Sequence, residues 1–322
     1  MASSKPAFFF SATQSVDDRL GAAFTFIWAN YAGLREFWWQ VRGFKQQFPE
    51  LHIKEVEKKF LSGLPIPGGI DFKKAFLNSD WAAHEQEFSK WLIFECCTLY
   101  EGWAEKVCHD LFSKSKRDSH AKSLQFPFVD AANPGYKSVI TDANSQVSTF
   151  MQQELLPTLK ASKLNCWDQM DAHLTAYSYF KKCRNSIIHS DGLCTQSILD
   201  LQVKIALEQS KKPSPFKNNF SLPVQVLNQK ITFDLRDCIL FGTIARKLIC
   251  TLDAALSVAS KSEVVMENRL RNLSSKKDKW KSLPSDPLRY EQRIHRMLSA
   301  AKIPEPQNLV NFIGWMKGKK LI

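Results

Sequence analysis

The stretch KKCRNSIIHSDG, residues 181–192, contains three polar side chains that suit phosphate chemistry. Arg184 has a permanent charge and a forked set of N–H donors that matches phosphate oxygens. His189 titrates near neutral pH and is able to act as a general base or a general acid. Asn185 lies four residues before His189, so on a helix its amide is able to orient the imidazole or a phosphate. The question is whether these residues react or only face solvent.

A helix over residues 165–191 is predicted, ending at Gly192 as its C′ glycine. At about 100° per residue, one stripe lies within about 60° and forms the core side: Ala176, Phe180, Cys183 and Ile187. The opposite stripe consists of Ser178, Lys182, Asn185 and His189. Arg184 lies beside the core stripe and joins the polar one by extending around the helix. The polar stripe faces water, another helix or another subunit, and its residue types are also ordinary for a solvated surface.

A zinc site is an alternative, because Cys183, His189 and Cys194 fall within twelve residues. However, Cys183 points to the core and His189 points away from it, and a fourth ligand has to come from elsewhere. The chain has 8 Cys and no Cys-x-x-Cys spacing. We therefore predict no metal and no cofactor, and buried free thiols in a reducing compartment.

The chain is predicted to be mainly α, since long amphipathic patterns alternate with few Gly (12) and Pro (14). Helices are expected at 15–47, 52–63, 80–112, 146–157, 165–191, 235–259, 287–301 and 306–317. Residues 113–136 read as a connection and residues 221–235 as a small β-hairpin. The polar stretch 269–287 is predicted to be flexible.

The formal net charge of +12 is uneven. Residues 261–322 contain 14 Lys and Arg against 6 Asp and Glu, which suits a polyanion such as nucleic acid or simply a solvated face. Trp280 and Trp315 lie among these lysines and either stack on bases or pack the small helices. No signal peptide and no apolar run long enough for a membrane span are evident, so we expect a soluble cytoplasmic protein without a membrane partner.

The motif Arg184-Asn185-Ser186-Ile187-Ile188-His189 resembles the Arg-x4-His signature of HEPN domains, which lies on a helix. The segment Leu99–Trp103, which contains Glu101, resembles the first conserved helix of many such domains. The resemblance covers about residues 80–259. It implies an antiparallel helical bundle with a hairpin insertion, preceded by a helical extension at 1–79 and followed by a basic helical tail at 260–322.

The resemblance implies a metal-independent endoribonuclease that cleaves RNA by attack of the 2′-OH, with catalytic residues Arg184, Asn185 and His189. Lys181, Lys182 and Glu101 are expected to help bind the RNA substrate. It also implies a homodimer through helix 165–191 and a role as a toxin or antiphage defence effector, with an antitoxin or sensor protein as partner. Ser, Asp and Gly follow His189, so regulation by adenylylation of a Tyr after the motif is in doubt. The alternatives are a non-catalytic HEPN-like RNA-binding or assembly module, and a nucleic-acid-binding protein whose function lies in the tail.

Overall fold

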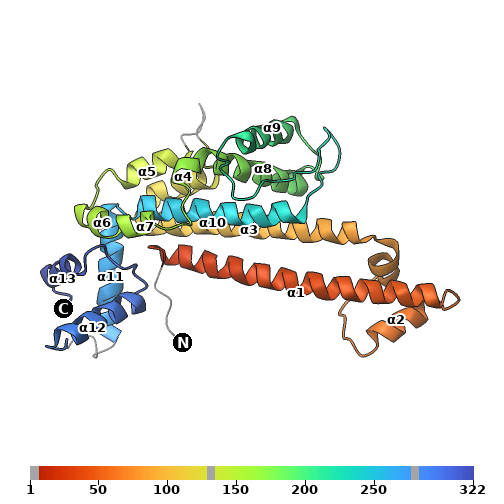
Figure 1. Cartoon of the computed structure of the whole chain (residues 1–322), viewed down its shortest axis with the longest axis horizontal. Coiled ribbons are helices and arrows are strands. Elements are labelled where there is room, and N and C mark those ends of the chain that lie inside the picture. The colour runs from red at the N-terminus through yellow and green to blue at the C-terminus, as the bar shows by residue number, and fades with distance from the viewer. Residues whose placement is uncertain (1–6, 129–134, 277–282) are drawn as a thin grey trace.

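The computed structural model describes residues 7–128, 135–276 and 283–322 (Figure 1). Short helices and turns connect a few long helices. The elements in chain order are α1 (Ser11–Gln47), α2 (Ile53–Leu61), the π-helical turn η1 (Lys73–Asn78), α3 (Trp81–Leu111), α4 (Lys114–Gln125), α5 (Gly135–Ala143), α6 (Thr149–Glu154), α7 (Leu156–Lys160), the 3₁₀ turn η2 (Trp167–Gln169), α8 (Met170–His189), α9 (Gln196–Ser210), α10 (Leu235–Leu256), α11 (Ser260–Lys276), α12 (Pro287–Ala300) and α13 (Leu309–Gly318).

The prediction of a mainly α chain is confirmed. Across residues 7–128, 135–276 and 283–322, the only β pairing consists of two isolated bridges, Val147 with Ala259 and Leu193 with Lys230. No helix in these ranges is both long enough and apolar enough to cross a membrane.

The β-hairpin predicted at 221–235 is not present as strands. The Gln225 side chain instead connects the two arms of this loop: its Nε2 donates to the Thr232 carbonyl at 2.7 Å, and its Oε1 accepts from the Thr232 N–H at 3.2 Å. The backbone of the loop pairs with residues 192–194, as the bond from the Asn228 N–H to the Cys194 carbonyl shows (2.9 Å), and at its tip the Gln229 N–H donates to the Val226 carbonyl (3.0 Å). The loop is therefore bonded to the turn after α8 and its two sides do not form a ladder.

Four helices lie where none was predicted: α4, α5, α9 and α11. The segment 113–136, predicted as a connection, contains α4, which buries only Ala121 and Leu124 and is otherwise polar, so its apolar periodicity was weak. The helix α9 buries Ile198 and Ile205 against α8. The helix α11 ends at Lys276, within the stretch predicted to be flexible.

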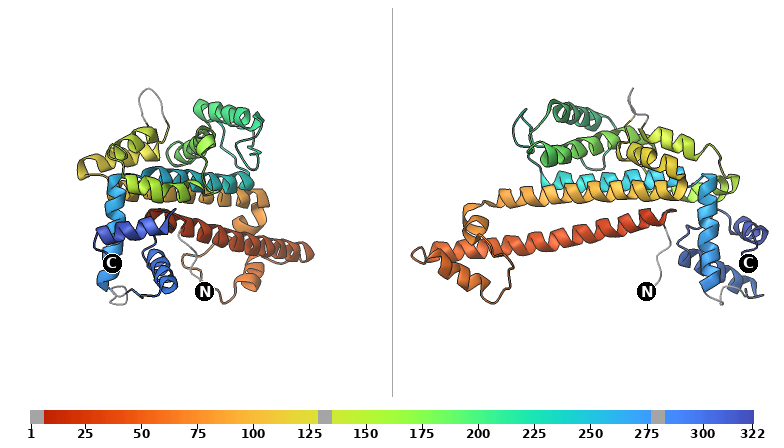
Figure 2. Two further views of the ribbon diagram at one scale, coloured as in Figure 1. Left: turned by 60° about the vertical axis from the view of Figure 1, so that its left-hand side comes forward. Right: turned by 180° about the vertical axis from the view of Figure 1, so that it is seen from behind.

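The helices form layers around a central pair, α3 and α10, which lie side by side (Figures 1 and 2). The helix α1 runs along one side of this pair, and α4, α5, α8 and α9 cover the other side. Both sides of α3 are therefore covered over much of its length, and its apolar residues at three- and four-residue steps are buried: Leu92, Cys96, Leu99, Trp103 and Val107.

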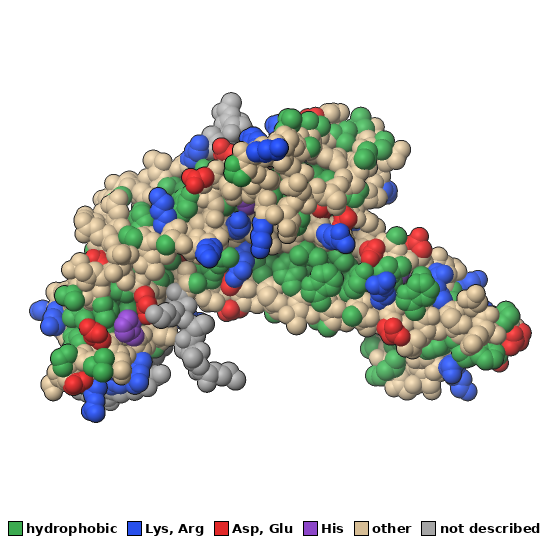
Figure 3. All heavy atoms as spheres, viewed as in Figure 1, with side chains coloured by type: hydrophobic (Ala, Val, Ile, Leu, Met, Phe, Trp, Pro, Cys, Tyr) green, Lys and Arg blue, Asp and Glu red, His purple; other side chains and the backbone are tan. Residues whose placement is uncertain are grey.

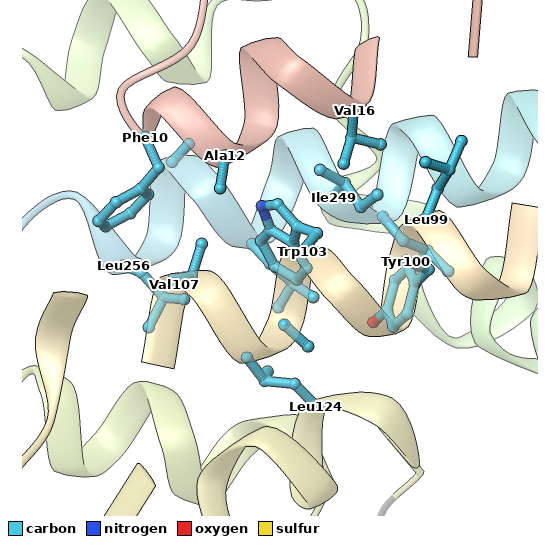
Figure 4. Packing of buried hydrophobic residues seen from close by; sticks show 14 of the residues in the cluster. Phe10, Ala12, Val16, Leu99, Tyr100, Trp103, Val107, Leu124, Ile249 and Leu256 are labelled. Atoms are coloured by element: carbon cyan, nitrogen blue, oxygen red, sulfur yellow. The ribbon is translucent and has the colours of Figure 1, made fainter. Parts of the chain in front are cut away.

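Trp103 of α3 is the centre of the core (Figure 4). Its side chain is fully buried, with Val16 of α1 and Ile249 of α10 near it and Leu124 of α4 below. The indole Nε1 donates to Thr13 Oγ1 at 2.8 Å, so the one polar atom of the ring is satisfied. On α10, a Cβ at Gly242 would lie 2.4 Å from the Phe24 ring, so a side chain there would require the ring to move.

The start of α1 is fixed by a buried carboxylate on α10. Asp253, which is 1% exposed, accepts the backbone N–H groups of Phe9 at 2.8 Å and Phe10 at 2.9 Å. Arg269 of α11 donates to the Phe9 carbonyl at 2.6 Å and lies over the Phe9 ring. Three segments that are distant in sequence therefore meet at the first turn of α1.

The far half of α1 forms a separate small core with α2 and η1. Its buried residues are Trp38, Val41, Val56, Phe72 and Phe76. Arg42 holds the connection to α3, since its guanidinium donates to the carbonyls of Leu77 and Ser79, both at 2.8 Å, and lies over the Trp38 ring. Residues of the first half of α1 belong to the main core.

The C-terminal helices are docked by two carboxylates. Glu154, which is 4% exposed, accepts from the Asn308 N–H and the Asn311 side chain, each at 2.8 Å. Glu263 of α11 accepts from Ser148 Oγ at 2.6 Å and from Trp315 Nε1 at 2.8 Å. These contacts place α13 against α6 and α11 in spite of the positive charge of the tail.

Replacing Asp253 with Ala should lower the free energy of unfolding by about 3 kcal/mol, because two buried N–H groups lose their acceptor and Arg269 loses a nearby opposite charge. Urea unfolding measures the loss. The control is Asp118→Ala on the exposed face of α4, for which a change within about 0.5 kcal/mol is expected. Equal effects of the two substitutions would contradict the anchoring role of Asp253.

The same carboxylate should make stability depend on pH. Burial raises the pKa of Asp253 to about 6, above the value of about 3.9 in an unfolded chain. The folded protein therefore binds this proton more tightly, and the resulting stabilisation is complete below about pH 4 and is lost as pH rises through about 6. Relative to Asp253→Asn, the wild type should gain up to about 3 kcal/mol between pH 7 and pH 4 in urea unfolding. A difference between the two proteins that is constant with pH would refute this prediction.

Candidate functional site

The helix α8 is buried along most of its length and exposed at its end. Ten of its residues between Ala172 and Cys183 are buried, because α8 lies between α9 on one side and α3 and α10 on the other. Ser178 of the predicted polar stripe is among them, at 5% exposure. The stripe therefore reaches the surface only in its second half, at Lys182, Asn185 and His189.

The chain leaves α8 through a tight, well-bonded turn. Asp191 has φ 51° and Gly192 φ 71°, so the first left-handed residue after the Ser190 cap is Asp191 and not, as predicted, Gly192. The N–H groups of Ser190 and Gly192 both donate to the Ser186 carbonyl, at 2.8 and 3.0 Å. The Gly192 carbonyl in turn accepts from the Ile231 N–H at 2.9 Å. The loop at 221–235 thus holds the turn that follows His189.

Arg184 is braced on the side of the helix by two neighbours. Its Nη1 donates to Asn185 Oδ1 at 3.0 Å, and its Nη2 lies 3.8 Å from Glu101 Oε2. The side chain is 22% exposed. Its Nε is buried and has no hydrogen-bond partner among the residues that the structure describes. A buried Nε cannot reach a ligand, so the remaining donor capacity of Arg184 is that of Nη1 and Nη2, whose four N–H groups make one hydrogen bond within the described part of the chain, to Asn185.

Glu101 of α3 is shared between Arg184 and Lys181. Its Oε1 lies 3.0 Å from Lys181 Nζ, and the Lys181 side chain is only 6% exposed. The Lys181 ammonium also donates to the Gln125 carbonyl and lies 3.9 Å from the centre of the Phe126 ring. The prediction that Lys181 attracts RNA from the surface does not fit this burial, whereas Lys182 is exposed as expected. Glu101, predicted to bind substrate, contacts the two cations instead.

Burial is the largest cause of the pKa shifts of Lys181 and Cys97, which lie next to the motif. It lowers the pKa of Lys181, although Glu101 acts in the opposite direction. Burial, and then the charge of Glu101, raise the pKa of the Cys97 thiol to about 12. Cys97 is therefore a protonated, unreactive thiol, and the charge beneath Arg184 comes from Glu101.

Asn185 and His189 are the accessible members of the motif. Asn185 is half-buried, with its oxygen engaged by Arg184, and His189 is exposed in the last turn of α8. Three large apolar side chains close to His189 in the chain or on the adjoining loop are also exposed: Ile188 (48%), Leu193 (37%) and Leu227 (45%). The end of α8 is thus a polar site with an apolar border.

The side chains of the zinc alternative do not converge. Cys183 and Cys194 are buried as free thiols, while His189 is exposed. Within the described ranges, no three His, Cys, Asp or Glu side chains are arranged to hold a metal ion.

A groove beside the motif was not predicted from the sequence. It has a volume of about 480 Å³ and lies between α8 and α9, with Asn185 at one end. The side chains that line it from α8 are Thr175, Ser178, Lys181, Lys182 and Asn185, those from α9 are Ser197, Asp200, Leu201 and Lys204, and Phe126 and Phe128 follow α4. The spacing of Ile198, Leu201 and Ile205 is the signal that would have predicted α9, and with it the groove.

A second, apolar groove of about 660 Å³ lies between α1 and α3. Phe26, Phe88 and Trp91 line it, and Ile187 of α8 reaches it from the other layer. Figure 3 shows hydrophobic side chains gathered over the middle of α1 and α3, with Lys and Arg side chains on the layer above.

Trp315 of the basic tail packs rather than lying open. Its ring is stacked on Phe150 with centroids 4.8 Å apart, and its Nε1 donates to Glu263. Trp280 lies outside the described residues.

Comparisons of the chain with family models, curated proteins and solved structures find no match.

The contact between Glu101 and Lys181, beside Arg184, predicts a measurable energetic coupling between these two side chains. Glu101→Ala leaves a buried ammonium without its counter-ion, so it should destabilise the protein by about 1–3 kcal/mol, with the lower values reflecting the partial exposure of Glu101. The double variant Glu101→Ala with Lys181→Ala should lose less than the two single losses added together. Urea unfolding of the four proteins measures the coupling, and strictly additive losses would show that the pair does not interact.

Proposed function

We propose that the chain is a HEPN-like, metal-independent endoribonuclease whose reacting groups are Arg184, Asn185 and His189. The observation that carries the proposal is their arrangement at the end of α8. A permanently charged guanidinium contacts Glu101 and Asn185, and an accessible imidazole lies five residues further along the chain, about 1.4 helical turns away. This combination supports catalysis on a phosphodiester, and the Arg-x4-His spacing is that of HEPN domains.

The proposed reaction needs only groups that the chain and the RNA supply. The 2′-oxygen attacks the adjacent phosphorus, a 2′,3′-cyclic phosphate forms, and the bond to the 5′-oxygen breaks. His189 takes the proton from the 2′-OH, and a second acid delivers a proton to the leaving 5′-oxygen. Arg184 stabilises the charge on the phosphorane oxygens with a forked donor. Asn185, oriented by Arg184, positions the phosphate or the imidazole.

A homodimer is part of the proposal, because one chain has only one motif His. Pairing the ends of two α8 helices brings a second His189 to the same phosphate. The exposed apolar side chains of Ile188, Leu193 and Leu227 border His189 and suit burial against a second copy. Lys182 adds positive charge at the rim. The inferred biological role is that of a toxin or defence effector whose partner, an antitoxin or a sensor protein, restrains or triggers it.

Two competing functions are less well supported by the structure. A non-catalytic HEPN-like module for RNA binding or assembly has no need of an accessible His beside a braced Arg. A tail that reads bases by stacking is disfavoured at Trp315, whose indole is already engaged by Phe150 and Glu263.

Cleavage of purified RNA in EDTA tests the proposal. The wild type should cleave and leave 2′,3′-cyclic phosphate ends, and Arg184→Ala and His189→Ala should each reduce the rate by about 100-fold or more, as expected for loss of a charge-stabilising group or a general acid–base. His109→Ala, which removes an exposed His on α3, is the matched control and should keep full activity. RNA binding without cleavage, equal in all four proteins, would favour the non-catalytic module.

A further inference from the structure

We propose that the groove between α8 and α9 binds an unpaired nucleotide of the RNA next to the cleaved bond, with its base stacked on Phe126 and its phosphate held by Lys182 and Lys204. The inference rests on the proposed function for the position of the cleaved bond. The groove itself, however, is defined by its own side chains. Its volume of about 480 Å³ lies within the range of about 300–1,000 Å³ that is typical of sites for small ligands.

The groove leads to the reacting groups. Its floor is formed by residues three or four apart on α8, namely Ser178, Lys182 and Asn185, and the same stripe continues to His189. Asn185 therefore belongs both to the groove and to the motif, since its amide oxygen accepts from Arg184. A strand that lies in the groove is directed to the end of α8, where its next phosphate meets Arg184 and His189.

Phe126 provides the surface for the base. The ring is 42% exposed and lines the groove, and the Lys181 ammonium lies 3.9 Å from its centroid. Lys181 is itself fixed by Glu101 and by the Gln125 carbonyl, so the ring contacts an ammonium that is held in place. Every nucleobase has a π-face, and stacking on an aromatic ring requires that the base be unpaired.

The charges of the groove suit a phosphate. Lys182 and Lys204 are exposed on facing helices, α8 and α9. The one acidic side chain in the lining, Asp200, is engaged by Gln196 Nε2 at 2.8 Å. Lys181 is balanced by Glu101. Asp200 keeps its negative charge when it accepts from the neutral Gln196 amide, so Lys182 and Lys204 together leave a net charge of +1 on the lining. Ser197 adds a hydroxyl group, which also lies 3.0 Å from Thr195 Oγ1.

Binding is measured with a labelled single-stranded RNA oligonucleotide and with the duplex of the same sequence. The full chain is used in EDTA and carries His189→Ala, so that the RNA stays intact. In this background, Phe126→Ala should raise the Kd for the single strand about tenfold, as expected for the loss of one stacked base. Lys204→Ala should reduce the slope of log K against log salt by about 0.7, the effect of one phosphate contact on a single strand. The duplex should bind more weakly and respond less to Phe126→Ala.

The control substitutions lie at the far end of α1 and in α2. Phe48→Ala removes a ring of similar exposure (41%), and Lys54→Ala removes an exposed lysine. If Phe126→Ala binds the single strand as tightly as Phe48→Ala does, or weakens duplex and single strand equally, the inference is wrong. Thermal melting of each variant separates lost binding from lost folding. If the wild type fails to cleave RNA but Phe126 and Lys204 control binding, the proposed function fails while the groove stands. Cleavage that depends on His189 but not on Phe126 would overturn the role of the groove and leave the proposed function standing.

Discussion

The buried carboxylate of Asp253 fixes where the longest helix of the chain begins. It accepts two backbone N–H groups at the start of α1, and from there α1 runs along the face of α3 and α10. One turn further, Thr13 of α1 accepts from Trp103, the central side chain of α3. Two residues before Trp103, Glu101 points to the opposite layer and contacts Lys181 and Arg184. The anchored start of α1 and the contacts of Glu101 under the motif are therefore connected through α3.

This connection explains why a buried acid is tolerated in an otherwise apolar core. The charged form is disfavoured by burial, which raises the pKa of Asp253, but it is compensated by the N–H groups of Phe9 and Phe10 and by nearby Arg269. A purely apolar contact would bury similar area without specifying the register of α1 along α3 and α10. The directional bonds of a carboxylate specify one start point, to within a residue.

The helices with strong periods were predictable, and those defined by their neighbours were not. The patterns of α1, α3, α8 and α10 each contain a long apolar stripe, and the structure has helices at those positions. By contrast, α4 buries two residues in twelve, too few to give a period. The predicted hairpin at 221–235 failed for a different reason: β-branched residues suit an extended backbone, but the partner of that backbone is the turn after α8. Local sequence carries no information about which distant segment supplies the hydrogen bonds.

The same distinction holds within the site. Helical geometry placed Asn185 and His189 on one face and Arg184 at its edge, and the structure agrees with that arrangement. It placed Lys182 and not Lys181 in the polar stripe, but it gave no sign that Lys181 is buried, because the partners of Lys181, Glu101 and the Gln125 carbonyl, lie on other elements. The two reacting side chains of the candidate site therefore differ in how they are fixed. Arg184 contacts Glu101 and Asn185, whereas His189 is exposed. In the proposed ribonuclease, RNA and a second copy of the chain must order the imidazole, so the rate of cleavage should depend on association of the chains as well as on substrate binding.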